Sequence, residues 1–511
     1  MNEDEDQEAV IAFLSQPETL DSSGPVERID THGAIVFLTP ERVFKLKRAV
    51  RYPYLDFSTA EKRRAVCEAE LRLNRRTAPD LYLEVRAINR TADGSLGFGP
   101  GEPVDWLVVM RRFADEDLLE AVAARGELDP ARVRALADHI AAFHAEAEVV
   151  TVHDGAARVR AVIDGNRASM AACEDAILPP NDCEALHEAS LNALESIAPL
   201  LDARGADGHV RHCHGDLHLA NICLWHGKPT LFDCLEFDPE LARTDVLYDL
   251  AFLIMDLWER GLREQASLAF NRYCDMTGER EGVAALPLFL SMRAAVRAHV
   301  NAQAAGQQND PAEKEAKRKA ARDYLAAARA LLDQPPPRLI AIGGLSGTGK
   351  STLAGKLAPE IGGAPGARWL RTDVLRKRLA GPAPEERLPP DAYTPEASAR
   401  LYRCLLDEAG AMLEAGRSVV VDGVFARADE REGVTSVAQA RQTAFTGLWL
   451  DAPESLLETR VKARIGDASD ADTAVVRIQQ AYDVGALDAW QRIDASGSVE
   501  AVVEVARRAA G

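Results

Sequence analysis

The sequence has few of the features that mark secreted, membrane-spanning or zinc-binding proteins. Its eight cysteines are scattered and none form a Cys-x-x-Cys pair, so we expect reduced thiols rather than disulfides or a zinc knuckle. No apolar run approaches the roughly 18 residues that a membrane-spanning helix needs. The first ten residues, MNEDEDQEAV, are acidic, unlike a secretory signal or a transit peptide. These absences predict a cytoplasmic protein that spans no membrane.

Positive charge is also scarce, because 60 basic residues stand against 80 acidic ones in a chain of 511, a net charge of -20. Phosphate neutralisation needs a basic face, so nucleic acid is an improbable main partner. Residues 338–511 hold about 22 basic and 24 acidic residues, which leaves about -18 on the first 337. Solubility explains this surplus, and attraction of a cationic substrate is the sharper alternative. The sequence does not indicate an oligomeric state.

The clearest boundary is the run of three prolines at 335–337. Proline cannot continue a helix, and a proline run forms a stiff linker. The prolines end an Ala- and charge-rich stretch that predicts a helix over roughly 312–333, and the apolar segment RLIAIGG follows at once. We therefore predict an N-terminal extension over 1–25, a first domain over 26–334 and a second over 338–511.

The two predicted domains differ in fold class. Residues 26–115 contain strand-like segments such as GAIVFLTPERVFKLKR, and residues 116–334 are mostly helical in pattern. A small β-rich lobe before a larger helical lobe is the α+β layout of a kinase-like fold. Residues 338–511 alternate strand and helix, which predicts an α/β fold with a parallel sheet.

The segment RHCHGDLHLANICLW, residues 211–225, holds the strongest chemical signal of the first domain. Asp216 and Asn221 have the spacing of a base that accepts a hydroxyl proton and an amide that binds Mg²⁺. The following residues, ICLW-HGKP-TLFD, predict a hairpin with Gly227 and Pro229 in its turn, and this hairpin would deliver Asp233 as a second, acidic metal ligand. Hard oxygen ligands of this kind suit magnesium.

A zinc site is the alternative interpretation of the same segment. His212 and His214 would share one face of a strand, and His218 could come around to meet them. The kinase interpretation makes more demands on the sequence, and the sequence meets them.

The motif HGDLHLAN…LFD resembles the aminoglycoside phosphotransferase family, which shares the protein-kinase-like fold with choline and fructosamine kinases. The resemblance covers roughly residues 25–330. It implies that Asp216 is the catalytic base and that Asn221 and Asp233 bind magnesium. It also implies a structural His214 and a supporting Asp249.

The resemblance further implies a nucleotide-binding lysine on the third strand and a glutamate on the next helix. Lys45 is the first choice for this lysine, and Lys47 stays an alternative because it lies on the same face of the strand. Glu70 is the preferred glutamate and Glu68 the second choice. The segment LVVMRRF around Met110 would be the hinge under the purine. The family's glycine-rich phosphate loop is missing, so the preference for ATP or GTP stays open.

The second domain opens with GLSGTGKS, which fits the phosphate-binding pattern G-x-x-x-x-G-K-[ST] between a strand and a helix. Its backbone N–H groups would wrap the phosphates, helped by the helix dipole. Lys350 would reach the β- and γ-phosphates, and Ser351 would hold Mg²⁺. The predicted nucleotide-binding residues are Gly344, Ser346, Gly347, Thr348, Gly349, Lys350, Ser351 and Thr352.

Three further segments favour a kinase over an ATP-driven motor. RSVVVDGVFA provides Asp422 for the metal but no adjacent carboxylate to activate water. Asp373 would accept the acceptor's proton and Arg376 would orient the acceptor or a phosphate, with a helix cap and a surface arginine as the alternatives. Arg460 and Arg464, at i and i+4, predict a lid that brings arginines over the transferred phosphate; an ordinary surface helix is the alternative.

Residues 338–511 resemble P-loop small-molecule kinases such as gluconate kinase, zeta toxin and the kinase half of polynucleotide kinase. The order of the two domains, phosphotransferase-like and then P-loop kinase, resembles that of bacterial bifunctional aminoglycoside phosphotransferase/ATP-binding proteins. It implies two ATP·Mg²⁺ sites that phosphorylate hydroxyls of small molecules, such as a sugar or amino sugar. In the alternative, only the P-loop domain is catalytic and the first domain is a binding or regulatory module.

Overall fold

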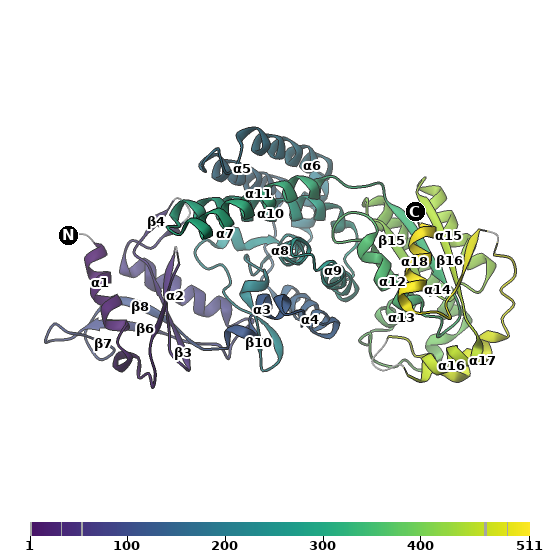
Figure 1. The fold of residues 1–511 in the computed structure, drawn as a ribbon, viewed down its shortest axis with the longest axis horizontal. Coiled ribbons are helices and arrows are strands. Elements are labelled where there is room, and N and C mark those ends of the chain that lie inside the picture. Colours follow the sequence, from purple (N-terminus) through teal and green to yellow (C-terminus); the bar gives the residue numbers. More distant parts are fainter. Residues whose placement is uncertain (1–2, 32, 53–54, 464–467, 488, 511) are drawn as a thin grey trace. The chain divides into compact units, whose positions relative to one another are not determined.

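The computed structural model describes residues 3–31, 33–52, 55–463, 468–487 and 489–510 (Figure 1). Contacts divide the chain into two units that are discontinuous in sequence. The first unit comprises residues 1–151 and 208–253, and the second comprises 152–207 and 254–511. The domain limits inferred from the sequence stay a prediction.

The first unit is built on a six-stranded antiparallel sheet with the order β1-β2-β3-β8-β6-β7. Phe37, Phe44 and Leu107 are buried in its core, where Val10 and Leu14 of the first helix join them. The strands are β1 (Glu27–Asp30), β2 (Ala34–Leu38), β3 (Arg42–Lys47), β6 (Tyr82–Arg90), β7 (Leu96–Gly97) and β8 (Glu102–Arg111).

Helix α2 (Ala60–Asn74) packs beside this sheet and begins at Thr59, whose side chain accepts a hydrogen bond from the N–H of Lys62. The other elements of the unit, with η for 3₁₀ helices, are α1 (Glu3–Leu14), η1 (Pro17–Leu20), β4 (Arg51–Tyr52), β5 (Leu55–Asp56), η2 (Asp115–Asp117), α3 (Leu119–Ala124), α4 (Pro130–Glu146), β9 (Val210–His212), η3 (Leu219–Asn221), β10 (Ile222–Trp225), β11 (Lys228–Leu231), α7 (Pro239–Ala242) and β12 (Arg243–Asp245). Helix α8 (Val246–Glu259) begins in this unit and ends in the second.

Strands β10 and β11 form the expected hairpin. Its turn consists of His226 and Gly227, whose φ angles of 51° and 75° match the two-residue turns that suit twisted strands. Pro229, which the sequence suggested as part of the turn, instead lies within β11 opposite Leu224. The hairpin leads the chain back to Asp233.

The second unit contains a five-stranded parallel sheet with the order β14-β15-β13-β16-β17. Helices α12 and α18 bury one face of it, where Ile340, Leu448 and Val503 share a core. The elements of this part are β13 (Arg338–Gly343), α12 (Lys350–Leu357), η5 (Ala358–Glu360), β14 (Arg368–Arg371), α13 (Thr372–Ala380), η6 (Pro390–Tyr393), α14 (Pro395–Glu414), β15 (Val419–Asp422), α15 (Ala428–Ala440), β16 (Ala444–Asp451), α16 (Glu454–Lys462), α17 (Thr473–Gln480), β17 (Trp490–Asp494) and α18 (Val499–Ala510).

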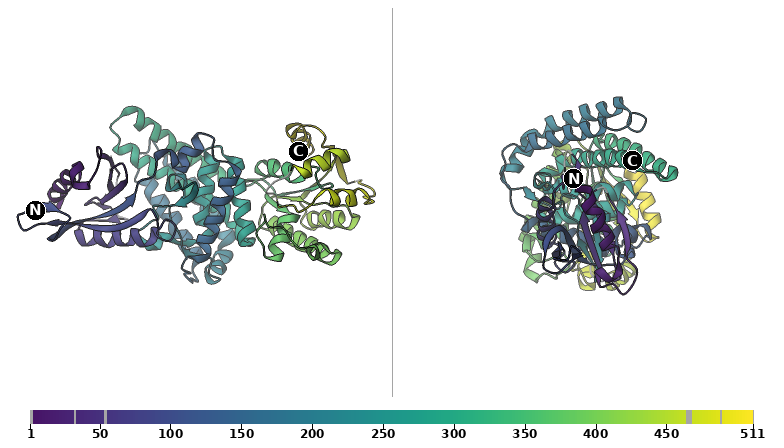
Figure 2. Two further views of the ribbon diagram at one scale, coloured as in Figure 1. Left: turned by 90° about the horizontal axis from the view of Figure 1, so that it is seen from below. Right: turned by 90° about the vertical axis from the view of Figure 1, so that its left-hand side faces the viewer.

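The rest of the second unit is helical, and its long helices α6, α10 and α11 lie side by side (Figures 1 and 2). Within the described residues one segment, Glu281–Gln307, is long and apolar enough to cross a membrane, and 67% of its most apolar window is buried inside the protein. Such burial is what the core helix of a folded domain shows. The helices are α5 (Gly155–Ala171), α6 (Pro180–Ala206), α9 (Arg263–Thr277), η4 (Glu281–Ala285), α10 (Leu286–Gln307) and α11 (Pro311–Leu332).

Candidate active sites

Asp216 and Asn221 lie together in the loop that follows β9. The Nδ2 of Asn221 donates to the main-chain oxygen of Asp216 at 2.9 Å and to its Oδ2 at 2.8 Å. The amide thereby orients Asp216 and leaves its own Oδ1, the atom that an amide offers to a cation, on its other side. The side chain of Asp216 is 42% exposed, so an acceptor hydroxyl can approach it.

Asp249, in the first turn of α8, supports this loop from the protein interior. Its Oδ1 accepts a hydrogen bond from the N–H of Gly215 at 2.8 Å, and its Oδ2 accepts one from the N–H of His214 at 3.1 Å. The ring Nε2 of His214 donates to the main-chain oxygen of Phe232 at 2.9 Å. The loop is therefore tied both to α8 and to the segment that carries Asp233.

The described residues do not gather His212, His214 and His218 into a metal site. Within them, one group of His, Cys and acidic side chains is close enough to hold a metal: His144, Cys213 and Asp249. Its carboxylate already accepts the two loop N–H groups, so hydrogen bonding accounts for its burial.

Lys45 on β3 contacts both Glu70 of helix α2 and Asp233, the candidate metal ligand. Its Nζ lies 3.0 Å from Oε1 of the buried Glu70 and 2.6 Å from Oδ1 of Asp233. Glu68, the second choice from the sequence, instead pairs with Arg64 on the exposed side of α2. Although burial opposes charge on both groups, the neighbouring carboxylates raise the pKa of Lys45, and Lys45 lowers the pKa of Asp233. This pair is therefore ionised.

Lys47 shares Glu70 with Lys45 but lies deeper, with its side chain 2% exposed. Its Nζ is 2.5 Å from Oε2 of Glu70 and also contacts Oε1 of Glu236. Burial raises the pKa of Glu236. The cluster thus contains three carboxylates, those of Glu70, Asp233 and Glu236, and two ammonium groups, those of Lys45 and Lys47. The surplus of carboxylates favours the binding of a cation.

Met110, proposed for the purine hinge, has its side chain in the core with Cys67, Tyr82 and Val108. It lies on β8 opposite Val43 of β3. The side chain is therefore part of the hydrophobic core, and a role for the backbone near Met110 in binding the purine stays a prediction.

The second site is the loop between β13 and α12. Gly344 and Gly347 have φ angles of 140° and 87°. A Cβ there would lie 2.6 Å from the oxygen of Leu450 and 2.7 Å from that of Leu457, so only glycine fits. The Nζ of Lys350 folds back over the loop and donates to the main-chain oxygen of Leu345 at 3.0 Å. The loop has the glycine geometry that a phosphate cradle requires.

Helices α16 and α17 contact this loop. Gln479 on α17 accepts a hydrogen bond from the N–H of Ser346 through Oε1, at 2.7 Å. On α16, Nη1 of Arg460 donates to the main-chain oxygen of Thr348 at 3.4 Å. Arg464 lies outside the described residues. One of the two predicted lid arginines is therefore at the phosphate loop, and the other stays a prediction.

Asp422 ends β15 close to the same loop and is 3% exposed. The indole Nε1 of Trp369 donates to its Oδ2 at 2.9 Å, and Nε of Arg371 lies 4.0 Å from the same oxygen. Burial raises the pKa of Asp422. A cation bound beside it would remove this electrostatic cost.

Asp373 and Arg376 lie on α13. Arg376 stacks over Tyr393 at 4.8 Å and donates to the main-chain oxygen of Ala392 at 2.7 Å. The Oη of Tyr393 donates to Oδ2 of Asp470 at 2.5 Å. Arg376 is therefore held against the η6 segment, which is in turn tied to Asp470, in the segment between α16 and α17.

Four residues of these sites were missed in the sequence: Glu236, Trp369, Asp470 and Gln479. Glu236 lies three residues after Asp233, the one signal that a search around the motif could have used. The other three contact residues that are distant in the sequence: Trp369 is 53 residues from Asp422, Asp470 is 77 from Tyr393 and Gln479 is 133 from Ser346.

The donor atoms of both sites fit Mg²⁺. Asn221 and Asp233 offer an amide and a carboxylate oxygen beside a surplus of negative charge. Ser351, at the start of α12, and the buried Asp422 offer a hydroxyl and a carboxylate. Hard oxygen donors without thiolates suit a cation that arrives with a nucleotide.

Two family models match the chain. Residues 42–286 match the phosphotransferase enzyme family (APH), and residues 339–483 match an AAA domain (AAA_33). The chain therefore carries an APH-type phosphotransferase domain followed by a P-loop kinase domain, as the sequence predicted. Both are ATP-using kinase types.

The chain belongs to the same family as two uncharacterized mycobacterial proteins, one from Mycobacterium tuberculosis and one from Mycobacterium bovis. It is 30% identical to each over 478 residues, which cover 92% of this chain and 92% of each relative.

Solved structures give weaker similarities. A choline/ethanolamine kinase family protein from Mesorhizobium loti aligns with 64% of this chain and 95% of its own, at 16% identity and a TM-score of 0.39. A sugar kinase from Janibacter sp. aligns with 34% and 94%, at 23% identity and a TM-score of 0.27. At scores this low, the roles of the site residues rest on the chain's own geometry.

Proposed function

We propose that this chain transfers the γ-phosphoryl group of ATP at two separate sites, each time to a hydroxyl of a small molecule such as a sugar or amino sugar. The observation that carries the proposal is that each site combines a carboxylate for the acceptor with cationic and oxygen groups for the nucleotide. These are Asp216 with Lys45, Asn221 and Asp233 in the first site, and Asp373 with Lys350, Arg376, Ser351 and Asp422 in the second.

In the first site, Asp216 accepts the proton of the acceptor hydroxyl while that oxygen attacks the γ-phosphorus. Lys45, fixed by Glu70, neutralises phosphate oxygens of ATP. Asn221 and Asp233 would hold Mg²⁺, which would supply positive charge to the phosphates of the nucleotide. The products are the phosphate ester and ADP.

In the second site, Lys350 leaves the oxygen of Leu345 and reaches the phosphates, which the loop N–H groups surround. Asp373 accepts the acceptor's proton and Arg376 orients the acceptor. Arg460 adds positive charge to the transferred group from the lid side, and Arg464 is proposed to do the same. Ser351 and Asp422 would hold Mg²⁺.

The test is mass spectrometry of metabolite pools incubated with ATP and either Asp216→Asn or Lys350→Ala, both in the full chain. Each substitution is expected to abolish one set of phosphorylated products and leave the other. If neither substitution changes any ATP turnover across the pools, the proposal of two active sites is wrong.

One observation favours the alternative in which only the P-loop domain catalyses. Residues 31–33, which connect β1 to β2, contain a single glycine, Gly33, where a glycine-rich loop over the phosphates would carry several. Nucleotide titration into the full chain with Lys350→Ala decides between the two. Retained Mg²⁺-dependent binding that Asp233→Asn weakens supports the first site, and no binding supports the alternative.

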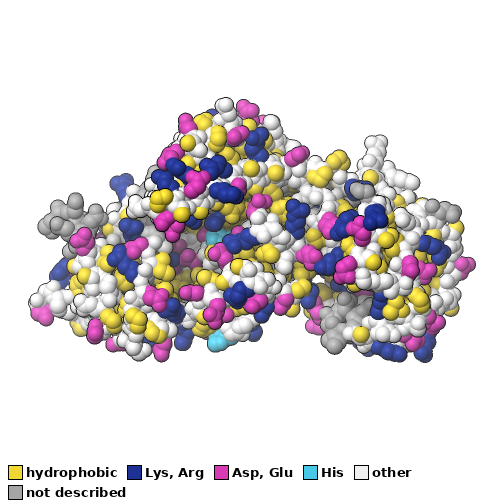
Figure 3. Space-filling view, viewed as in Figure 1, with side chains coloured by type: hydrophobic (Ala, Val, Ile, Leu, Met, Phe, Trp, Pro, Cys, Tyr) yellow, Lys and Arg dark blue, Asp and Glu magenta, His cyan; other side chains and the backbone are white. Residues whose placement is uncertain are grey.

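We further propose a cytoplasmic protein with small-molecule partners rather than nucleic acid. On the face seen in Figure 3, basic and acidic side chains are interspersed rather than gathered into one basic stripe. A nucleic acid would need such a stripe to neutralise its phosphates.

A further inference from the structure

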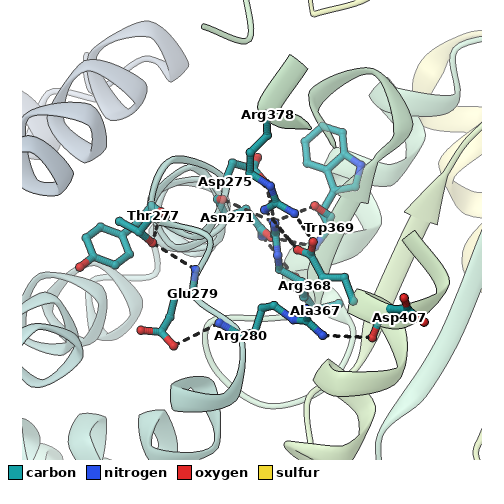
Figure 4. A network of polar contacts seen from close by, with 12 residues as sticks. Asn271, Asp275, Thr277, Glu279, Arg280, Ala367, Arg368, Trp369, Arg378 and Asp407 are labelled. Atoms are coloured by element: carbon teal, nitrogen blue, oxygen red, sulfur yellow. Dashed lines mark hydrogen bonds and ion pairs between the residues drawn. The ribbon is translucent and has the colours of Figure 1, made fainter. Parts of the chain in front are cut away.

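Helix α9 (Arg263–Thr277) lies against the P-loop sheet within the second unit (Figure 4). It comes from the segment matched by the phosphotransferase family, residues 42–286, whereas β14 (Arg368–Arg371), the strand that it meets, lies within the AAA match, 339–483. Ion pairs join α9 to segments around the sheet: Arg272 pairs with Glu385, in the loop after α13, at 3.0 Å, and Glu264 pairs with Lys356 of α12 at 2.8 Å. One family's helix therefore packs directly on the other family's sheet.

Asn271 of α9 pairs with the outer edge of β14 as a neighbouring strand would. Its Oδ1 accepts a hydrogen bond from the N–H of Trp369 at 2.7 Å, and its Nδ2 donates to the main-chain oxygen of Ala367 at 3.2 Å. An N–H and a C=O two residues apart point to the same side of a strand. Asn271 is 3% exposed, so water does not compete for these bonds.

Arg368, 1% exposed, reinforces this contact from within the sheet. Its Nη1 donates to Oδ1 of Asn271 at 3.1 Å, and its Nη2 lies 2.5 Å from Asp275 (Figure 4). The same Nη2 lies 3.1 Å from Glu408. Burial opposes its charge, but the two carboxylates outweigh burial and raise the pKa of Arg368. A buried, charged guanidinium thus connects α9, β14 and α14.

The same strand leads to the nucleotide site. Trp369, whose main chain Asn271 holds, donates from its indole to Asp422 at 2.9 Å. Asp422 is buried at the end of the adjacent strand β15, with Arg371 of β14 opposite it in the register. The direction of the Asp422 carboxylate therefore depends on where the indole is held.

We propose that Asn271 is a positioning residue of the P-loop site. It holds the main chain of β14 in place and directs the Trp369 indole toward Asp422. It thereby fixes the orientation of the carboxylate that would hold Mg²⁺. This inference rests on the function proposed for the P-loop site and deepens it, because a residue of the phosphotransferase half then determines metal binding in the kinase half.

The test uses the full chain with Asn271→Leu, which keeps the side-chain size and removes both hydrogen bonds. Hydrogen–deuterium exchange at the Trp369 amide is expected to rise about tenfold or more. With Asp216→Asn as the background, the Mg²⁺ concentration for half-maximal P-loop activity is expected to rise about tenfold, as for other groups that orient metal ligands. Trp369→Phe, which removes only the indole donor, is expected to raise the Mg²⁺ requirement similarly.

Asn301→Leu is the matched control, because Asn301 is also a buried helical asparagine but donates to Arg297 of its own helix, at 2.8 Å. It should leave the Mg²⁺ requirement unchanged. The double variant Asn271→Leu/Trp369→Phe should match the larger single effect, because both act through one indole.

An unchanged Mg²⁺ requirement in Asn271→Leu or in Trp369→Phe would overturn the proposal. If Asn271→Leu fails to fold, Trp369→Phe alone decides the link to Asp422. If the chain transfers no phosphoryl group at all, the proposed function fails. Mg²⁺-dependent binding of a non-hydrolysable ATP analogue then tests Asn271 by the same comparison.

Discussion

The ammonium group of Lys47 lies 2.5 Å from Oε2 of Glu70, on the oxygen opposite to the one that Lys45 contacts. One buried carboxylate therefore anchors two lysines of the same strand. They differ in surroundings, because Lys45 also reaches Asp233 and Lys47 reaches Glu236. This difference predicts different roles for the two lysines.

Lys45→Met is expected to lower first-site turnover by about 100-fold or more, because it removes the charge beside the phosphates. Lys47→Met should instead destabilise the first unit by about 3–5 kcal/mol, because Glu70 and Glu236 keep buried charge without that partner. Steady-state kinetics and thermal denaturation check both. Lys62→Met, at an exposed lysine paired with Asp56, is the control. Equal stability loss in both variants would contradict the assignment.

Gln479 accepts a hydrogen bond from the N–H of Ser346, a group that a bound phosphate would use. Gln479→Ala should therefore tighten nucleotide binding at the P-loop by about 2–10-fold, the value of one hydrogen bond, and Gln479→Glu should weaken it by charge repulsion. Calorimetric titration of an ATP analogue in a Lys45→Met background measures this. Gln480→Ala, at the exposed neighbour, is the control. Weaker binding in Gln479→Ala would show that the glutamine supports the loop instead.

Tyr393→Phe removes the hydroxyl that anchors η6 to Asp470 but keeps the ring beneath Arg376. The acceptor's KM at the second site should rise by about 2–10-fold while the KM for ATP stays constant. Tyr482→Phe, at an exposed tyrosine, should change neither. A change confined to the KM for ATP would place Tyr393 on the nucleotide side.

Acid should destabilise the second unit through His299 on α10. Burial lowers the pKa of His299 to about 4, whereas an unfolded histidine titrates near about 6.5. Between these values the unfolded state binds more protons, so the free energy of unfolding falls as the pH drops from about 6.5 to about 4, by at most about 3 kcal/mol.

His299→Gln should remove this part of the pH dependence, measured as urea midpoints at pH 7 and pH 5. His226→Asn, in the exposed hairpin turn, keeps the dependence and serves as the control. An unchanged midpoint difference in His299→Gln would assign the acid sensitivity to other groups.

The parts of the fold and sites that the sequence predicted are those fixed by local spacing. The P-loop between a strand and a helix, and the hairpin that leads to Asp233, depend on neighbouring residues and turn chemistry. Lys45 and Lys47 could not be separated, because side chains two apart on a strand share a face. Only the folded chain brings Glu236 to Lys47.

Contacts between distant segments were beyond sequence patterns. The proline run at 335–337 indicated a break between two domains, yet Asn271 on one side of it pairs with Trp369 on the other. Nothing in the spacing around Asn271 distinguishes it from an asparagine at an ordinary helical position. Its role depends on which strand edge it meets.

The bond between Asn271 and β14 also bears on aggregation. An outermost strand offers unpaired N–H and C=O groups to other chains, and natural proteins cover such edges. Here the main-chain groups of Trp369 and Ala367 are covered by helix α9, which lies before the proline run in the sequence. A fragment cut at the prolines would carry this edge uncovered and would be prone to edge-to-edge association, although its sequence contains the whole nucleotide motif.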